Sequence, residues 1–447
     1  MQKITSKMEK FFFLFLIINP ILDVLSGAFI FIVEQINASR VNPFQMPMTP
    51  SLLVRLLIFG LFGLYLLLVF DKRAILTMLP IAAAWGLSVL GEFLFFYRFD
   101  LMTDAQYMIR FVYNIAMLFV YARVFRLCGM TKQELVRKLH NIIIATLNLL
   151  SLSILIPYIW GIGYSTYGDR FGFRGFRGFF YSGNDITAVM MLLLPLAFAV
   201  YLQIDKKESR LRRAFAASAC GLTVAAMFLI GTKTAFLAAG AAVAVPGIYS
   251  IWRFFSKKDK TMLLRMVITA LIFLLSLVFL SVFSVKGEVF ETIGDSLGAA
   301  GDIAGKEGIA TALLSGRQRK LMRAFTMQKE GGLFSLLFGV GRGTQRFVVE
   351  MDIFEVLIYY GVFGALTMLW LYVKLGMSFL FTLFRRFDLT GLCCGCALAL
   401  CVGYLFIAGH ILFSVTSGFY FAFVLLYSKL HYTERLEQFQ VISLRGE

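Results

Sequence analysis

The sequence predicts an all-α membrane protein with about 12 transmembrane helices. Of its 447 residues, 59% are hydrophobic and only 15% are charged, whereas soluble domains have about 45–50% apolar and about 25% charged residues. The 48 phenylalanines outnumber the 26 acidic residues, which excludes an intrinsically disordered chain. A membrane helix uses about 20 apolar residues, so about 12 helices leave enough chain for substantial loops. The composition excludes a water-soluble enzyme.

About twelve apolar runs mark the expected membrane spans. They cover approximately residues 11–33, 52–70, 74–97, 107–125, 139–160, 186–202, 214–230, 235–252, 262–285, 353–384, 389–408 and 411–427. The tenth run is too long for one straight span, and Gly361 and Gly364 indicate that its first turns lie at the membrane interface. The first run has no small-residue cleavage site, so we expect a retained span rather than a signal peptide.

The distribution of positive charge predicts that both termini are cytoplasmic. Lysine and arginine collect in alternate connections between spans, because cytoplasmic loops of membrane proteins are enriched in both residues. These connections include Lys72, Arg73, Arg123, Arg126, Arg137, Lys206, Arg212, Arg253, Lys257 and Arg386. The net charge of +17 would suggest nucleic acid in a soluble protein. Here the membrane topology accounts for most of it, and we expect no nucleic-acid partner.

Two loops on the expected outer side carry positive charge against this rule. The first, 161–184, contains Arg170, Arg174 and Arg177; the second, 286–352, holds nine lysines and arginines. An anionic partner on the outer face would explain them. The chain therefore divides into 1–285 with the first nine spans, a large extracytoplasmic loop at 286–352, and 353–447 with the last three spans and a cytoplasmic tail.

The large loop has predictable internal structure. Gly294–Gly308 is rich in Gly, Ala and Asp, and is typical of a flexible stretch. Ser315 and Gln318 match a capping box, which predicts a short helix running to about Lys329. The Gly-Val-Gly-Arg-Gly segment at 339–343 predicts a tight turn whose backbone closely approaches another part of the molecule. It lacks the third glycine and the strand–helix context of a nucleotide-binding motif.

The predicted loop helix is amphipathic. Leu321 and Phe325 share one face, whereas Arg319 and Arg323 share another. An apolar face with basic residues above it suits a helix lying at the membrane surface. An inert surface helix with solvated charges is the alternative.

Ionisable residues give two sets of candidates for function, and no metal-ligand or cofactor motif accompanies them. Within or near the spans lie Asp23, Arg55, Glu92, Arg110 and Lys374, which act either in function or in packing. On the expected outer side lie Arg174, Arg177, Lys233, Arg317, Glu350 and Asp352. Cations from separate segments with carboxylates beside them suit the binding of a diphosphate and the activation of a hydroxyl.

The order of these motifs resembles the O-antigen ligase/polymerase superfamily of bacterial membrane glycosyltransferases. The shared features are an Arg-Gly-Phe loop before the sixth span, a Thr-Lys turn before the eighth, Ser315-Gly316-Arg317, the glycines at 339 and 341, and Gly361 at a break. The resemblance implies a fold similar to type C glycosyltransferases. It also implies that the protein transfers or polymerises an undecaprenyl-diphosphate-linked glycan on the outer face of the bacterial cytoplasmic membrane, without metal or nucleotide sugar.

The resemblance also implies roles for single residues. Arg174 or Arg177, together with Lys233 and Arg317, would bind the diphosphate. Either Glu350 or Asp352 would be the base that activates a hydroxyl acceptor, from a glycan or another molecule. Residues two apart on a helix point about 200° apart, so at most one of these carboxylates should face the cavity, and we favour Glu350.

Two departures from the family pattern bear on the acceptor. Lys233 stands where many members have arginine, which keeps the charge but loses the bidentate geometry. Glu350 stands where ligases of lipopolysaccharide commonly carry histidine. A polysaccharide polymerase and a ligase to another acceptor therefore both remain open.

Two other classes of protein compete with the transferase. A flippase or other transporter of lipid-linked oligosaccharides would also have about 12 spans and a cationic cavity, but it does not need a 67-residue external loop at 286–352. A structural membrane protein is the third alternative.

Overall fold

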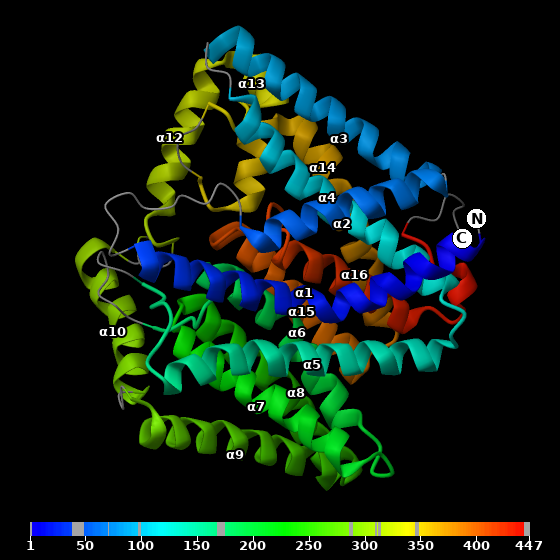
Figure 1. Ribbon diagram of the computed structural model, residues 1–447, viewed down its shortest axis with the longest axis vertical. Helices are drawn as coiled ribbons and strands as arrows, with labels where there is room; N and C mark the ends of the chain where they lie inside the picture. The colour runs from blue at the N-terminus through cyan, green and yellow to red at the C-terminus, as the bar shows by residue number, and fades with distance from the viewer. Residues whose placement is uncertain are drawn as a thin grey trace. The chain divides into compact units, whose positions relative to one another are not determined.

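The computed structural model of the protein describes residues 2–37, 49–69, 71–96, 100–167, 175–285, 289–308, 311, 314–344 and 348–441. Within these ranges the chain is almost entirely helical (Figure 1), and the only β-type pairing is an isolated bridge between Ser165 and Phe176. The predicted fold class is confirmed.

The α-helices, with their bounds, are α1 (Gln2–Asn37), α2 (Pro50–Leu68), α3 (Lys72–Gly91), α4 (Leu101–Leu127), α5 (Lys132–Ile159), α6 (Gly183–Gln203), α7 (Arg210–Ile230), α8 (Lys233–Lys257), α9 (Lys260–Phe283), α10 (Val289–Glu307), α12 (Arg317–Glu330), α13 (Gly332–Phe338), α14 (Asp352–Arg385), α15 (Leu389–Ile407) and α16 (Ser417–Tyr432). A π-helical turn, Glu92–Phe96, continues α3, and a 3-10 turn, Leu436–Gln438, follows α16.

Among the described residues, 11 helices are long and apolar enough to cross a membrane. They correspond to the first eleven expected spans, and the twelfth corresponds to α16, which is shorter at 16 residues. The described chain divides into two compact units. Unit 1 comprises Met1–Ile58, Leu127–Ala299 and Arg386–Leu400; unit 2 comprises Phe59–Arg126, Ala300–Arg385 and Cys401–Glu447.

In unit 1, α7 packs against α5, α6, α8 and α9, and Figure 1 shows α5, α7 and α9 stacked one below the other. Small residues on α7 make this possible, because they let helix backbones approach closely in a membrane. A Cβ atom on Gly221 would lie 2.6 Å from the side chain of Ile272 in α9. Leu271, Leu274 and Leu275 of α9 remain exposed, as expected for a lipid-facing surface.

A largely buried ion pair joins α1 to the part of α2 that belongs to unit 1. The Arg55 guanidinium donates to both carboxylate oxygens of Asp23, at 2.7 and 2.6 Å, and to the Asn19 side chain at 2.9 and 2.8 Å. Only 2% of the Arg55 side chain is exposed. Charges in a membrane interior are costly unless they are paired, so these two intramembrane residues serve the packing of α1 against α2.

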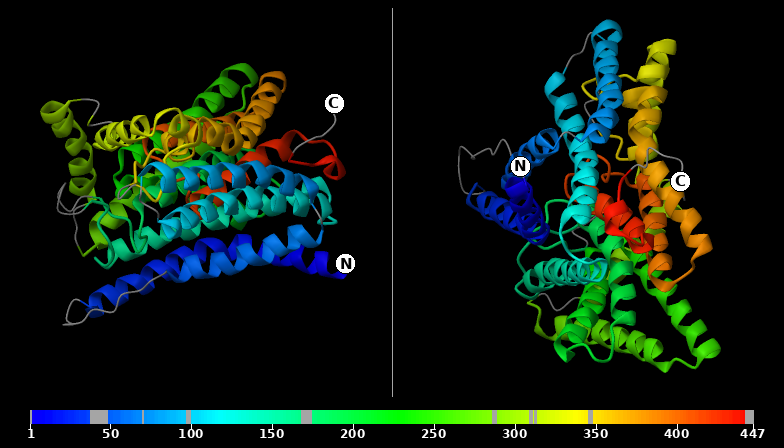
Figure 2. Two further views of the ribbon diagram at one scale, coloured as in Figure 1. Left: turned by 90° about the horizontal axis from the view of Figure 1, so that it is seen from above. Right: turned by 90° about the vertical axis from the view of Figure 1, so that its right-hand side faces the viewer.

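In unit 2, α14 breaks at Gly361, whose φ of +67° is not helical. The break leaves backbone carbonyls without their intrahelical partners. The glycine-rich segment after α13 supplies the missing donors: Val340 N–H binds the Ile358 carbonyl and Gly341 N–H binds the Tyr359 carbonyl, both at 3.0 Å. In Figures 1 and 2 the chain runs through α12 and α13, in yellow, into α14, in orange.

Two expectations about the large loop are wrong. Gly294–Gly308 is not a flexible stretch but most of α10, and one face of this helix is anchored: Ile293 and Ser296 are buried. That burial outweighs the cost of helical glycines, about 1 kcal/mol each. The capping box is absent as well, because Gly316 is the N-cap and the Gln318 side chain donates to Thr311 at 2.8 Å.

The loop helix itself is confirmed as α12. Leu321 and Phe325 are half-buried, whereas Arg319 and Arg323 are exposed, as the periodicity predicts. The ring of Phe325 packs edge-on against Phe354 of α14, with 6.4 Å between centroids. This contact fixes α12 against the helix that follows the candidate carboxylates.

Candidate functional site

In unit 1, glycines bring the loop before α6 against the turn between α7 and α8. Phe176 N–H donates to the Leu229 carbonyl at 2.7 Å, near the end of α7. Gly175 has φ +66°, and a Cβ atom there would lie 2.4 Å from the Ile230 carbonyl oxygen. Gly231 then ends α7 in the left-handed conformation. Any other residue at position 175 would push the two segments apart.

The turn after Gly231 places Lys233 at the start of α8. Thr232 is the N-cap, and its hydroxyl accepts from Ala235 N–H at 3.1 Å. Lys233 is partly exposed in the first turn of the helix. The Thr-Lys turn expected before the eighth span is therefore present, and its backbone lies beside the loop that carries Arg177.

Arg177 is held by aromatic and backbone contacts. Its backbone N–H donates to the Tyr164 carbonyl at 3.0 Å, and its guanidinium lies 5.3 Å from the centroid of the Tyr164 ring. Its Nε is buried and has no hydrogen-bond partner among the described residues. Burial lowers the pKa of Arg177, although the nearby Tyr164 opposes this shift. Arg174 lies outside the described residues.

In unit 2, Arg317 and Lys320 converge on one carboxylate. Nε and Nη2 of Arg317 both lie 3.1 Å from one oxygen of Glu350, and Lys320 Nζ lies 2.7 Å from the other. The two cations are three residues apart on the first turn of α12, so they share a face. The carboxylate is 28% exposed. The site is thus a compact cluster of two cations and one anion.

The electrostatics of Glu350 favour its ionised form. Burial opposes ionisation, but the hydrogen bond from Lys320 and the charges of Arg317 and Lys320 outweigh it and lower the pKa of Glu350. The residue also has φ +65°, an uncommon conformation for a side chain that is not glycine. Such backbone strain clusters at functional sites.

Asp352 has a different environment. It is fully buried as the first residue of α14, and its carboxylate accepts backbone N–H groups from His410, Ile411 and Leu412 at 2.8, 2.7 and 2.7 Å. The argument from helical spacing is wrong for this pair, because Glu350 precedes the helix with a positive φ. The two carboxylates nevertheless meet different partners: Glu350 faces cations, and Asp352 anchors a turn.

That turn introduces a residue that sequence reasoning did not place at the site. A Cβ atom on Gly409 would lie 2.6 Å from the carbonyl carbon of Glu350. The next residue, His410, has φ +70° and contributes to lowering the pKa of Glu350. Lys320 was missed too. Its spacing from Arg317 was a usable signal, whereas nothing local in the sequence connects His410 with Glu350.

Further carboxylates anchor the loop from which Glu350 projects. Asp104 accepts from Arg342 N–H and Gly343 N–H, both at 2.8 Å, and Glu92 accepts from Gly343 N–H at 2.7 Å. Both acids are fully buried. A Cβ atom on Gly341 would lie 1.9 Å from a Glu92 oxygen. The predicted close approach at the glycine-rich turn is confirmed, and the two carboxylates are what the turn approaches.

A second anchor lies nearer to the cluster. Glu355 accepts from Glu350 N–H at 2.8 Å and from the Tyr107 hydroxyl at 2.7 Å. The hydrogen bond to Glu355 holds the strained backbone of Glu350 in place, while the Glu350 side chain faces Arg317 and Lys320. Across the described ranges, no group of three or more His, Cys, Asp or Glu side chains could hold a metal ion.

The chain matches the family model described as O-antigen ligase like membrane protein, over residues 5–302 and 300–431. Searches among curated proteins and among solved structures found no match. The family match supports a ligase or glycosyltransferase activity related to polysaccharides, in a membrane and with a lipid-linked glycan donor. Taken with the membrane-spanning helices and the order of the glycine and arginine motifs, it shows that the chain belongs to the family of O-antigen ligase like membrane proteins.

Proposed function

We propose that the protein transfers or polymerises an undecaprenyl-diphosphate-linked oligosaccharide on the outer face of the cytoplasmic membrane. The observation that carries this proposal is the cluster of Arg317, Lys320 and Glu350 on an anchored loop. Cations suit a diphosphate leaving group, and a carboxylate suits a hydroxyl acceptor. The retention of positive charge in loops that the topology predicts to be external supports the outer location.

The reaction is a single displacement at C1 of the donor sugar. Arg317 stabilises the negative charge that develops on the diphosphate as the bond between C1 and oxygen breaks. Glu350 accepts the proton of the acceptor hydroxyl while the hydroxyl oxygen bonds to C1. The products are the lengthened or transferred glycan, with inverted configuration at C1, and undecaprenyl diphosphate. A diphosphate is already a good leaving group, so no general acid is required, and cationic side chains take the place of a metal ion in stabilising its charge.

The ion pairs of Glu350 fit this sequence of events. Without donor, Arg317 and Lys320 neutralise the carboxylate and lower its pKa. A bound diphosphate competes for the same cations, because both anions accept the guanidinium fork. Release from the cations raises the pKa of Glu350 and makes it a stronger base. Donor binding thereby prepares the carboxylate for the acceptor.

Purified protein in detergent, supplied with a lipid-linked oligosaccharide and a hydroxyl acceptor, tests the proposal. We expect longer or transferred glycan, with the new bond opposite in configuration to the donor. A flippase makes no product there, since detergent leaves no compartments to connect. Absence of product with every acceptor offered, alongside donor flipping in vesicles, would replace the transferase with a transporter.

A further inference from the structure

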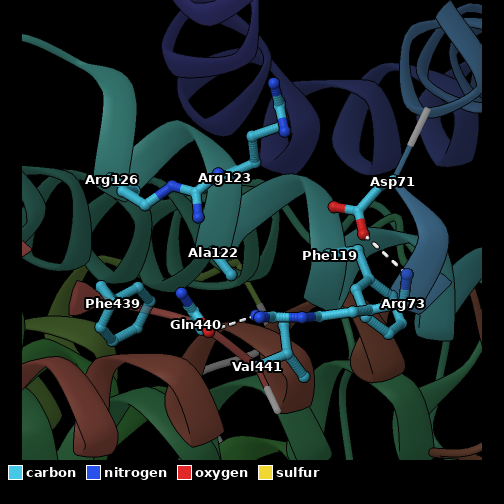
Figure 3. Close-up of a pocket in the computed structure, with 9 residues that line it drawn as sticks. All are labelled: Asp71, Arg73, Phe119, Ala122, Arg123, Arg126, Phe439, Gln440 and Val441. Carbon is cyan, nitrogen blue, oxygen red and sulfur yellow. Dashed lines mark hydrogen bonds between the residues drawn. The ribbon is translucent and has the colours of Figure 1, made fainter. Parts of the chain in front are cut away.

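A second cationic site lies in unit 2, away from the cluster around Glu350. Three arginines line a partly open pocket of about 30 Å³ (Figure 3). Arg123 and Arg126 come from the last turns of α4, and Arg73 comes from the first turn of α3. The C-terminal segment 439–441 forms the remaining wall. None of these residues has a role in the proposed glycan transfer.

The C-terminal wall is held in place by side chains of unit 2. Arg73 donates through Nη1 to the Gln440 side chain (Figure 3), and Lys429 donates to the Gln440 carbonyl at 2.5 Å. The ring of Phe439 packs on Phe125 of α4, with 5.9 Å between centroids. The pocket is therefore a built feature in which a returning segment closes over helix ends.

The charge in this pocket is not balanced by the chain. Three arginines and one aspartate, Asp71, line it, which leaves two positive charges in excess. The Asp71 carboxylate caps α3, accepting from Arg73 N–H at 3.2 Å and Ala74 N–H at 3.3 Å. Within the described part of the chain, no ion pair joins it to Arg123 or Arg126. Three half-buried guanidinium groups with this excess of positive charge suit an anion from outside the chain.

Part of the hydrogen-bonding capacity of the arginines is also unused. Arg123 Nε is buried and has no hydrogen-bond partner among the described residues, although its guanidinium lies 6.0 Å from the Tyr65 ring centroid. A pocket of about 30 Å³ exceeds the roughly 10–15 Å³ needed for one water, so polar oxygens such as those of a phosphate can enter it. Arginine forks match phosphate oxygens in geometry as well as charge.

A neighbouring apolar groove suits a group attached to such a phosphate. It runs between α3 and α14, has a volume of about 340 Å³, and shares Arg73 with the cationic pocket. Its lining is mainly apolar and includes Leu76, Leu366 and Trp370, which are all more than half exposed. A cationic pocket at helix ends with an apolar groove beside it, joined through Arg73, matches a headgroup with an attached acyl chain.

We propose that this site binds an anionic phospholipid, with its phosphate among Arg73, Arg123 and Arg126 and an acyl chain along the α3–α14 groove. The three arginines stand on the side that the charge distribution predicts to be cytoplasmic. A lipid bound there holds the C-terminal segment against the ends of α3 and α4. The site is separate from glycan transfer, and a lipid bound there stabilises the fold of unit 2.

The test measures thermal unfolding of the purified full chain in neutral detergent against added phosphatidylglycerol, phosphatidylcholine or inorganic phosphate. We expect phosphatidylglycerol to raise the unfolding midpoint, with little effect from the other two. Arg126→Gln should weaken the apparent affinity for phosphatidylglycerol about 10-fold or more, since charge-assisted hydrogen bonds are lost. The Arg126 side chain makes no hydrogen bond within the described ranges, so its replacement should leave the lipid-free midpoint unchanged.

Arg385→Gln is the matched control. Arg385 is an exposed arginine at the end of α14 and lies outside the pocket, so this variant should bind phosphatidylglycerol as the wild type does. Equal stabilisation by phosphatidylglycerol and phosphatidylcholine would overturn the proposal, as would wild-type affinity in Arg126→Gln. Equal protection by inorganic phosphate would show an anion site without the lipid and would overturn the assignment of the groove.

Discussion

Replacing Glu350 by glutamine tests whether this carboxylate is a catalytic base or only forms structural ion pairs. The change keeps the side-chain shape and removes the negative charge that meets Arg317 at 3.1 Å and Lys320 at 2.7 Å. The three side chains are 28%, 11% and 39% exposed, and partly exposed ion pairs contribute about 0–1 kcal/mol each. Losing both pairs thus costs at most about 2 kcal/mol, or roughly 30-fold in rate. A general base contributes about 10²–10⁴-fold.

We therefore expect Glu350→Gln to reduce turnover at least about 100-fold, with binding of the lipid-linked donor intact. The assay is the initial rate of glycan transfer at saturating donor, with donor binding and the unfolding midpoint measured on the same preparation. Asp352→Asn is the comparison. It should lower the unfolding midpoint, because the carboxylate accepts three backbone N–H groups.

Three results would decide against this reasoning. Turnover of Glu350→Gln within a few fold of wild type removes Glu350 as the base. If Asp352→Asn is then inactive with an unchanged unfolding midpoint, the base is Asp352. If both variants transfer glycan, the carboxylate mechanism is wrong and the cations alone carry the reaction.

The same assay against pH checks the electrostatics of Glu350. Burial alone would raise its pKa, but Lys320 and Arg317 reverse the effect and lower it below the ordinary value of 4.5. The stability that these cations contribute is therefore full above the pKa of the unfolded chain and is lost as pH falls through the lower folded value. Lys320→Ala should move the acid limb of the kcat/KM profile, which reports the donor-free enzyme, to higher pH, because it removes one of the cations that lower the pKa of Glu350. If Lys320→Ala leaves the acid limb unchanged, Glu350 is not the group that accepts the proton.

Three further predictions follow from the architecture. Gly341→Ala should destabilise the protein by roughly 1–3 kcal/mol, because φ is +71° and the new Cβ would lie 1.9 Å from a carboxylate oxygen. Gly376→Ala, whose Cβ would meet nothing within 4 Å, is the control. Equal unfolding midpoints of the two variants would refute the clash at position 341. Arg55→Ala should lower the unfolding midpoint, because it removes the hydrogen bonds that Arg55 donates to Asn19 and Asp23, and an unchanged midpoint would refute this structural role. Reporters fused at Gly301 and at Glu447 should lie on opposite sides of the membrane, and a shared side would refute the topology.

The fold was predictable because the bilayer imposes a simple rule, namely a long apolar helix for each span. The rule worked for the first eleven spans and was least accurate for the twelfth. There the chain at 409–412 forms a turn that Asp352 holds through backbone N–H groups, which hydropathy does not detect. A different prediction failed for α10. Its glycine content predicts a flexible stretch, whereas the burial of Ile293 and Ser296 stabilises a helix.

The candidate site was predictable only in its local parts. Glycines at 339–343 predicted a close approach, but their partners Glu92 and Asp104 are about 240–250 residues away in sequence. The meeting of Arg317 with Glu350 likewise joins residues 33 apart. Such pairings depend on how the helices pack, and single-sequence patterns carry no information about them.

The most direct test of the central claim, that cations of this chain hold a lipid diphosphate during glycan transfer, is the transfer rate of Arg317→Ala. Each charge-assisted contact is worth about 1.5–3 kcal/mol, or roughly 10- to 150-fold, so we expect a loss of at least that size at equal amounts of folded protein. Arg317→Lys should keep part of the activity, since the charge remains without the fork, and Lys233→Arg, which adds a fork, should be tolerated. Near-wild-type transfer by Arg317→Ala would contradict the account.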